Sequence, residues 1–366
     1  MLCERRPLRP PFPFFGKEMI DNIDHCRAYR AKSDFRRCWL PTGLRSPCVV
    51  SSRSFATMSV AIFLIALGAA GVMGFANQRG GTCTVAAIEE IVDHGRFGRA
   101  RALLETSLWI AGGLLVLGTF GRLPQTPNGY SASIATVSGG ILFGIGAFVN
   151  RACIFGAVAR LGSGEWAYLG TPVGFFAGVL IGNALPEPGK ITGTALLLSG
   201  PIWLALIAAI LIVGRSFFHA RRIRMGKKKI LEAVWSPHFA TMIIGLTFLV
   251  ALQAGGAWTY SEYFSDIARG HSSGGAIKLL LNLALLTGAV VGGWTAGKNR
   301  FILPDLGSVV RTTLGGIIMG LGGSLIPGGN TGLVLIGMPL LWPYAWLAFG
   351  SICLTIYVAI RITRLR

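Results

Sequence analysis

The sequence predicts an all-α polytopic membrane protein with about nine transmembrane helices, short re-entrant hairpin helices and an inverted internal repeat of pseudo-twofold symmetry. Three observations predict this class. Hydrophobic residues make up 52% of the 366 residues and charged residues only 13%, whereas soluble domains carry about 25% charged residues. Mean hydropathy is +0.60. Apolar runs of membrane-crossing length recur from Met58 onward, and glycines interrupt several of them.

The formal net charge of the chain is +19. In a soluble protein this balance would indicate a nucleic-acid partner. Here Lys and Arg lie between the apolar runs, where they determine the orientation of the helices in the membrane. We therefore expect a lipid bilayer around the protein and no nucleic acid as partner.

Residues 1–57 differ from the rest of the chain. They hold eleven Lys and Arg, five Asp and Glu, four of the seven cysteines, and no apolar run long enough for a span or a signal-peptide core. The four cysteines form no CxxC pair, which favours unpaired thiols over a zinc site. We expect a basic, disordered N-terminal extension at 1–57, with Met58 as the candidate biological start, and a single transmembrane domain at 58–366.

Nine apolar segments follow, each long enough, or short but glycine-rich enough, to be a span. They are Met58–Ala76, Leu103–Phe120, Ile134–Val149, Ala167–Ala184, Thr192–Gly214, Phe239–Gln253, Leu279–Ala296, Val309–Ile326 and Pro343–Ile360. The basic loop 215–232 carries seven Lys and Arg against one Glu, which predicts that it lies in the cytoplasm. Counting outward from it places the C-terminus inside and the start of the first span outside.

An internal repeat is visible at an offset of 176 residues. When Gly139–Tyr168 is laid on Gly315–Tyr344, nine of the thirty positions are identical. The repeat halves are about 58–190 and 235–362, with the span 192–214 linking them. Four spans in each half and one linking span make the two halves inverted relative to each other, which is the general architecture of secondary transporters and some channels.

Two interruptions of the apolar pattern are candidates for a site. The glycine-rich segment 139–164 runs into Asn150, Arg151 and Cys153 and then continues apolar. It has the pattern of a membrane helix that stops and restarts, and at membrane depth such a break is tolerated only where the freed backbone is buried in protein or lines a wet cavity.

The other interruption follows the first span, where Arg79, Gly80 and Gly81 precede Thr82 and Cys83. Glycines let the backbone approach a ligand, Thr82 can cap a short helix, and the exposed N–H groups of that helix favour an anion. A thiol beside them offers a soft, weakly hydrogen-bonding sulfur.

Each of these residues also has an ordinary interpretation. A free cysteine is commonly a small buried residue, and an arginine near a span end is commonly a topology signal. Cys83 and Cys153 depart from that pattern because both lie beside Arg at helix breaks, whereas Cys353 lies within a span. The histidines show no HxxxH or HExxH spacing, so we expect no metal, no cofactor and no catalytic residue.

Three segments resemble the YeeE/YedE sulphur-transport family of bacterial inner-membrane proteins: RGGTC with AAIEEI after it, NRACIFGAVARLGSGEWAYLGTPVGFFAG, and PGGNTGLVLIGMPLLWPYAWLA. The resemblance implies a multi-pass transporter, not an enzyme, that takes up thiosulfate or a related small sulfur-containing anion. It implies a relay of thiol hydrogen bonds without covalent chemistry, and a TusA-like sulfur-carrier protein in the cytoplasm is a candidate partner.

Carried onto this chain, Cys83 and Cys153 stand at the two first-half cysteine positions of the family. The second-half cysteine is missing: Gly329 and Asn330 stand there, with Thr331 beside them. A relay without that thiol can serve another sulfur or selenium species. A membrane thiol enzyme that forms a persulfide or disulfide through the same cysteines, and a purely structural assembly subunit, are the other open classes.

Overall fold

The computed structural model describes residues 60–124, 126–185, 188–191, 195–199, 202–225, 235–271, 275–297 and 302–365. The expectations for residues 1–57 lie outside this range. Within it the chain is almost entirely helical, and seven helical stretches are long and apolar enough to cross a membrane. They are Val60–His94, Gly98–Thr119, Ile134–Gly162, Pro237–Ala254, Gly275–Thr295, Leu306–Leu325 and Pro343–Leu365. The protein is therefore an all-α multi-pass membrane protein.

Two of the nine expected spans are shorter apolar helices in the structure, Trp166–Gly182 and Trp203–Phe218. The linking helix also differs from the expectation in its position. We expected it at Thr192–Gly214, but a 3₁₀ turn occupies Leu196–Ser199 and α8 runs from Ile202 to Met225. Pro201 directly precedes α8, and proline suits the start of a helix but not its interior. Because α8 continues past Gly214, Arg215 lies on a helix and not in a loop.

The first half of the chain begins with a long helix followed by a short one. Its elements are α2 (Val60–Gly80), α3 (Thr84–His94), α4 (Gly98–Thr119), α5 (Ile134–Asn150), α6 (Ile154–Gly162), the 3₁₀ turn η2 (Trp166–Leu169) and α7 (Gly170–Gly182). Two short strands, β1 (Gly129–Tyr130) and β2 (Lys190–Ile191), pair antiparallel with Gly129 opposite Ile191. A 3₁₀ turn, η3 (Leu196–Ser199), precedes α8.

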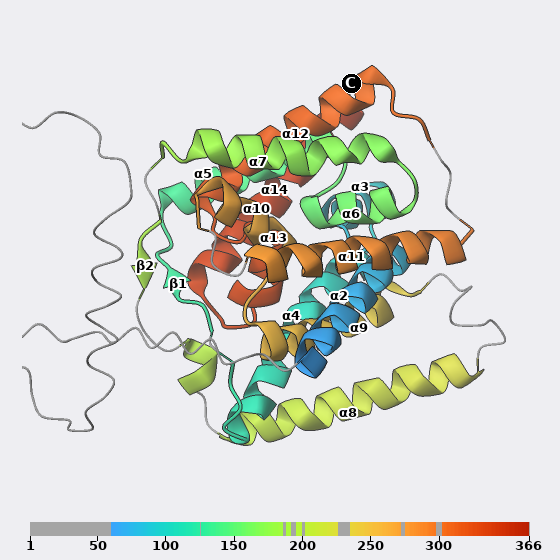
Figure 1. The fold of residues 1–366 in the computed structure, drawn as a ribbon, viewed down its shortest axis with the longest axis vertical. Coiled ribbons are helices and arrows are strands. Elements are labelled where there is room, and N and C mark those ends of the chain that lie inside the picture. The colour runs from blue at the N-terminus through green and yellow to red at the C-terminus, as the bar shows by residue number, and fades with distance from the viewer. Residues whose placement is uncertain are drawn as a thin grey trace, which may run out of the picture. The chain divides into compact units, whose positions relative to one another are not determined.

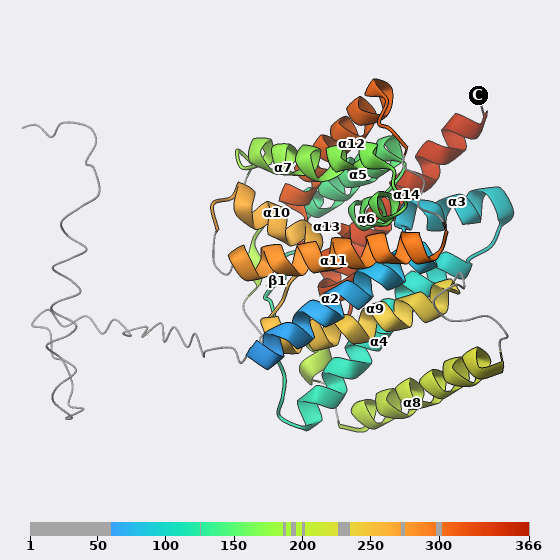
Figure 2. The same cartoon turned by 45° about the vertical axis from the view of Figure 1, so that its right-hand side comes forward.

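The second half has the same alternation of long and short helices. Its elements are α9 (Pro237–Gly255), α10 (Tyr260–Ala268), α11 (Gly275–Thr295), α12 (Leu306–Leu325), α13 (Gly329–Gly332), a π-helical turn η4 (Leu333–Gly337) and α14 (Pro343–Leu365). The long helices pack into two groups (Figures 1 and 2). In one group α12 packs on α5 and α7, and α14 packs on α5; in the other α2 packs on α9 and α11, and α4 packs on α8 and α9.

The short helices lie between the two groups. α6 contacts α2 and α11, α3 contacts α4 and α14, α10 contacts α7 and α11, and η4 contacts α4 and α14. Buried side chains such as Phe143, Phe175 and Met319 fill the space between the helices, each with 0% exposure. Most polar residues at the first two breaks, among them Asn77, Thr82 and Asn150, are buried inside the bundle, whereas the Arg151 side chain is exposed.

Candidate functional site

The two cysteines predicted at the breaks are the N-cap residues of two short helices. Cys83 precedes α3 and Cys153 precedes α6. Their sulfur atoms lie 3.6 Å apart, although the residues are 70 positions apart in the sequence. Cys153 is buried and Cys83 is half-buried, and both are free thiols. The fold thus brings together the two sulfur atoms that the sequence motifs marked separately.

Each break is shaped by local backbone conformation. At the first, Gly81 has a φ of +57°, in the left-handed region that glycine occupies at little cost, and it reverses the chain between α2 and α3. At the second, Arg151 has a φ of +59°, which is uncommon for a residue with a side chain. The Asn150 side chain secures that turn, because its Nδ2 donates to the carbonyl of Ala152 at 2.7 Å.

Buried polar side chains connect the breaks to each other. The Thr82 hydroxyl donates to Asn77 Oδ1 at 2.7 Å, and Asn77 Nδ2 donates to the carbonyl of Phe155 in α6 at 2.8 Å. The Asn150 Oδ1 atom accepts a hydrogen bond from Thr171 at 3.0 Å. The positions of the two cysteines are therefore fixed by amide and hydroxyl groups, and not by apolar packing alone.

Backbone N–H groups at the start of α6 point at both sulfur atoms. The Gly156 N–H donates to Cys153 Sγ at 3.3 Å, and the Cys153 N–H donates to Cys83 Sγ at 3.4 Å. Helix N-termini carry partial positive charge, so this arrangement favours electron-rich atoms at the cysteine pair.

A third segment completes the site from the second half of the chain. The Asn330 Nδ2 atom donates to Thr84 Oγ1 at 3.3 Å, next to Cys83. A cavity of about 30 Å³ adjoins this contact. It is lined by Thr82, Thr84, Leu103, Thr106, Phe155, Ile244, Asn330, Thr331, Val334 and Leu335. Within the described chain, Asn330 Oδ1 and Thr331 Oγ1 are buried there without a hydrogen-bond partner.

The sequence profile described as sulphur transport matches residues 79–358, which is most of the chain and includes both cysteines and the segment 329–331. The chain belongs to the sulphur-transport family. Among curated proteins no match is found. Membership agrees with the multi-pass helical fold and with a site built from sulfur atoms and helix N-termini.

The structure brings together only some of the ten residues that we predicted for this sulphur-transport protein. Cys83, Cys153, Thr82, Asn330 and Thr331 converge at the cysteine pair and its cavity. The other predicted residues act on the backbone or point elsewhere. Gly81 forms the first turn, Asn150 holds the second, and Gly329 has a φ of +54° and lies against Phe143 and Ser261.

The two arginines of the prediction differ in where their side chains lie. Arg79 is buried, its Nη2 donates to Thr295 Oγ1 at 2.7 Å, and its guanidinium lies 5.2 Å from the centre of the Phe75 ring. Arg151 has an exposed side chain. The partial positive charge at the cysteine pair therefore comes from backbone N–H groups and not from these two guanidinium groups.

Asn77 and Gly156 have structural roles at the site that sequence analysis did not assign. Asn77 is a buried amide near the end of an apolar helix, and polar groups in such helices commonly mark functional regions. Gly156 allows α6 to approach Cys83: a Cβ atom there would lie 2.5 Å from Cys83 Sγ and 2.9 Å from Cys83 Cβ. Gly156 lies within an apolar helical pattern, and nothing in that pattern indicated that Cys83 packs against it.

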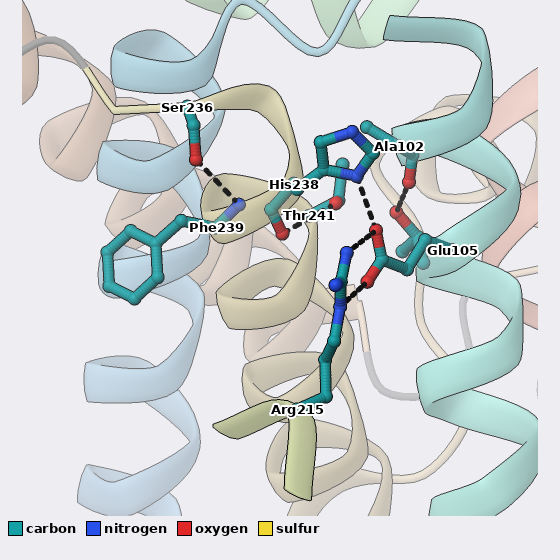
Figure 3. Close-up of polar contacts among 8 residues, drawn as sticks. Ala102, Glu105, Arg215, Ser236, His238, Phe239 and Thr241 are labelled. Carbon is teal, nitrogen blue, oxygen red and sulfur yellow. Dashed lines mark hydrogen bonds and ion pairs between the residues drawn. The ribbon is translucent and has the colours of Figure 1, made fainter. Parts of the chain in front are cut away.

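A separate charged cluster joins three helices of the sulphur-transport protein away from the cysteine pair (Figure 3). Arg215 on α8 donates through Nε to Glu105 on α4 at 2.8 Å, and the ring of His238 on α9 also contacts the Glu105 carboxylate. The described residues contain no group of three or more His, Cys, Asp or Glu that could hold a metal ion. We interpret this cluster as a link between helices.

Proposed function

We propose that the protein is an uptake transporter of the bacterial inner membrane for thiosulfate or a related small sulfur-containing anion. The anion passes the cysteine pair by hydrogen bonds, without covalent chemistry. The observation that carries this proposal is the pair of sulfur atoms 3.6 Å apart at the N-termini of two short helices, enclosed by the bundle. Family membership supports a sulfur substrate.

The chemistry of the site suits such an anion. A dianion with a terminal sulfur needs dipoles that offset its charge but do not retain it, and helix N-termini supply this better than several full charges. Thiols are weak donors that match a polarizable sulfur atom. The buried Thr331 hydroxyl and the Asn330 amide, both lining the cavity beside the thiols, add polar contacts for the oxygen atoms of the anion.

The second half of the chain offers no thiol at the equivalent place, and this bears on the substrate. Gly329 and Asn330 stand where the resemblance places the second-half cysteine of thiosulfate transporters. The cavity beside the cysteine pair is therefore lined by an amide and hydroxyl groups and by no third thiol among the described residues. A sulfur or selenium oxyanion other than thiosulfate is the alternative substrate on this ground. Delivery to a TusA-like carrier protein in the cytoplasm is part of the same proposal.

We also propose that the two halves form an inverted repeat with pseudo-twofold symmetry and nine spans. Contacts between glycines support it. The offset of 176 relates Gly139 to Gly315 and Gly146 to Gly322. Under a twofold axis, contact of Gly139 with Gly322 requires contact of Gly146 with Gly315. A Cβ at Gly322 would lie 2.7 Å from the Gly139 carbonyl oxygen, and one at Gly315 would lie 2.9 Å from that of Gly146.

The test is uptake of labelled thiosulfate into proteoliposomes, in competition with sulfite, sulfate and selenium anions. We expect thiosulfate or another anion with terminal sulfur or selenium to be taken up, and sulfate to compete poorly because it lacks a soft atom. Absence of uptake for all of these anions would contradict the proposal. Intact mass of the protein after incubation separates the thiol-enzyme alternative, since a persulfide or disulfide changes the mass and a hydrogen-bonded anion does not.

A further inference from the structure

Glu262 lies in the first turn of α10, in the sequence Thr-Tyr-Ser-Glu. Thr259 caps this helix by accepting a hydrogen bond from the Glu262 N–H at 3.3 Å. In a capping box of this kind the glutamate normally returns a bond to the cap residue. Here the Glu262 Oε2 atom is buried and has no hydrogen-bond partner in the described part of the chain. A buried carboxyl oxygen without a donor disfavours the charged form.

Few charged groups lie around Glu262 in the described part of the chain. Asp266 lies one turn further along α10 and forms an ion pair with Lys278 of α11. The phenol of Tyr344, at the start of α14, also interacts electrostatically with the Glu262 carboxyl. The described parts of α6, α7, α12 and α13, which also pack on α10, place no charge on this carboxyl.

The helix α10 is outside the seven membrane-spanning stretches. Burial first, and then the Asp266 carboxylate, raise the pKa of Glu262 to about 7, while Lys278 and Thr259 lower it. Because the pKa of an acid is raised, the carboxyl binds a proton below about pH 7 and releases it above. Both states are therefore populated at physiological pH.

The first turn of α10 touches the break that completes the cysteine site. The Ser261 hydroxyl donates to the carbonyl of Gly328 at 2.6 Å. Gly328, with a φ of +83°, begins the segment whose Asn330 amide bonds to Thr84, the residue after Cys83. Glu262 therefore lies on a helix turn that is connected to the cysteine site through Ser261 and the glycine break.

We propose that Glu262 is a proton-binding group that takes up and releases one proton in each transport cycle, so that anion uptake is coupled to proton entry. This inference rests on the proposed function. A dianion that enters a negatively charged interior moves against the membrane potential, and each proton that enters with it removes one of the opposing charges. The Glu262 carboxyl suits a proton, because metal cations need several oxygen ligands and the Asp266 carboxylate is already paired with Lys278.

The experiment compares two kinds of uptake in proteoliposomes that contain a trapped pH indicator. Counterflow exchange of the labelled anion needs transport but no proton gradient, and net uptake under an inward gradient of about one pH unit, set around the Glu262 pKa, needs coupling. We expect the wild type to show both, with internal acidification that accompanies net uptake. Glu262→Gln should keep counterflow within about twofold and lose both the stimulation by the gradient and the acidification.

Two further variants control this comparison. Glu262→Asp retains a carboxyl and should retain stimulation with a shifted pH profile. Asp93→Asn removes an exposed carboxylate paired with Arg364 and should behave as the wild type. Stimulation and acidification that persist in Glu262→Gln would overturn the inference, as would wild-type counterflow without any effect of the gradient. Absence of wild-type counterflow for every sulfur or selenium anion would overturn the proposed function and this inference with it.

Discussion

At the scale of single residues, the site depends on cysteines that cap helices. Ser, Thr, Asp and Asn are the usual N-caps, because a side-chain oxygen accepts an N–H bond from the first turn. Cys153 fills the same role with sulfur by accepting from the Gly156 N–H. The same atom is therefore both a structural acceptor for α6 and, in the proposed function, a contact for the passing anion.

Substitution of Cys153 separates these roles. Cys153→Ser should keep a large part of uptake because a hydroxyl caps the helix and donates a hydrogen bond. Cys153→Ala should lose about tenfold, the equivalent of one hydrogen bond of about 1.4 kcal/mol. Initial rates of uptake at equal protein density measure this. Cys83→Ser should likewise keep more uptake than Cys83→Ala, with smaller losses for both. Cys353→Ala should change uptake little. Ser as inactive as Ala at position 153 would favour a required persulfide or disulfide.

Gly156 offers a second test at this scale. Gly156→Ala places a Cβ 2.5 Å from Cys83 Sγ and 2.9 Å from its Cβ, so α6 and the start of α3 have to separate. We expect uptake to fall by about tenfold or more while the protein still inserts and stays monodisperse, because the overlap is local. Gly68→Ala is the matched control, since nothing lies within 4 Å of a Cβ there. Normal uptake by Gly156→Ala would show that the spacing of the sulfur atoms does not matter.

At the scale of helices, Glu105 connects α4 to α8 and α9. The Arg215 side chain is 49% exposed and that of Glu105 only 17%. Removal of Arg215 leaves the Glu105 carboxylate with the His238 ring as its remaining contact. Removal of Glu105 leaves Arg215 without this partner, but an exposed guanidinium regains water more easily than a largely covered carboxylate. Loss of Arg215 should therefore lower the stability of the protein more than loss of Glu105.

This inequality predicts an order of thermal stabilities. Arg215→Gln should lower the melting temperature in detergent by about 1–4 °C, and Glu105→Gln should lower it less. Arg160→Gln, which removes the local pair with Glu165, is the control and should change it by less than either. Thermal unfolding followed by tryptophan fluorescence measures the order. Equal effects of Arg215→Gln and Arg160→Gln would mean that α8 is held to α4 by apolar contacts alone.

At the scale of the whole molecule, the charge of the loops predicts the orientation in the membrane. With the basic segment after α8 in the cytoplasm, the C-terminus should also be cytoplasmic. A fluorescent protein fused after Arg366 should fluoresce, and an alkaline phosphatase fused there should be inactive. The reverse pattern would contradict nine spans and an inverted repeat together, because an even number of crossings would then separate the start of α2 from the C-terminus.

The sequence alone determined the class of fold, the family and most helix positions. Long apolar segments cannot be stable in water, and their backbone must form helices in lipid, so composition and run length are sufficient for this. The residues that mark the breaks were also visible, because Gly81, Asn150 and Cys153 interrupt apolar runs. The boundaries of α8 were not, since the apolar residues of the 3₁₀ turn η3 have the same composition as a membrane helix.

Only the tertiary structure decided which of the marked residues meet. The 3.6 Å contact between Cys83 and Cys153 depends on how α3 and α6 pack, and no pattern within either motif specifies it. Arg79 and Arg151 stand beside the cysteines in the sequence, yet α2 directs one to Thr295 and the turn at 151 exposes the other. Residues that are adjacent in the sequence lie close together along the backbone. The direction of each side chain, however, follows from the helix or turn that carries it. The site therefore required the fold.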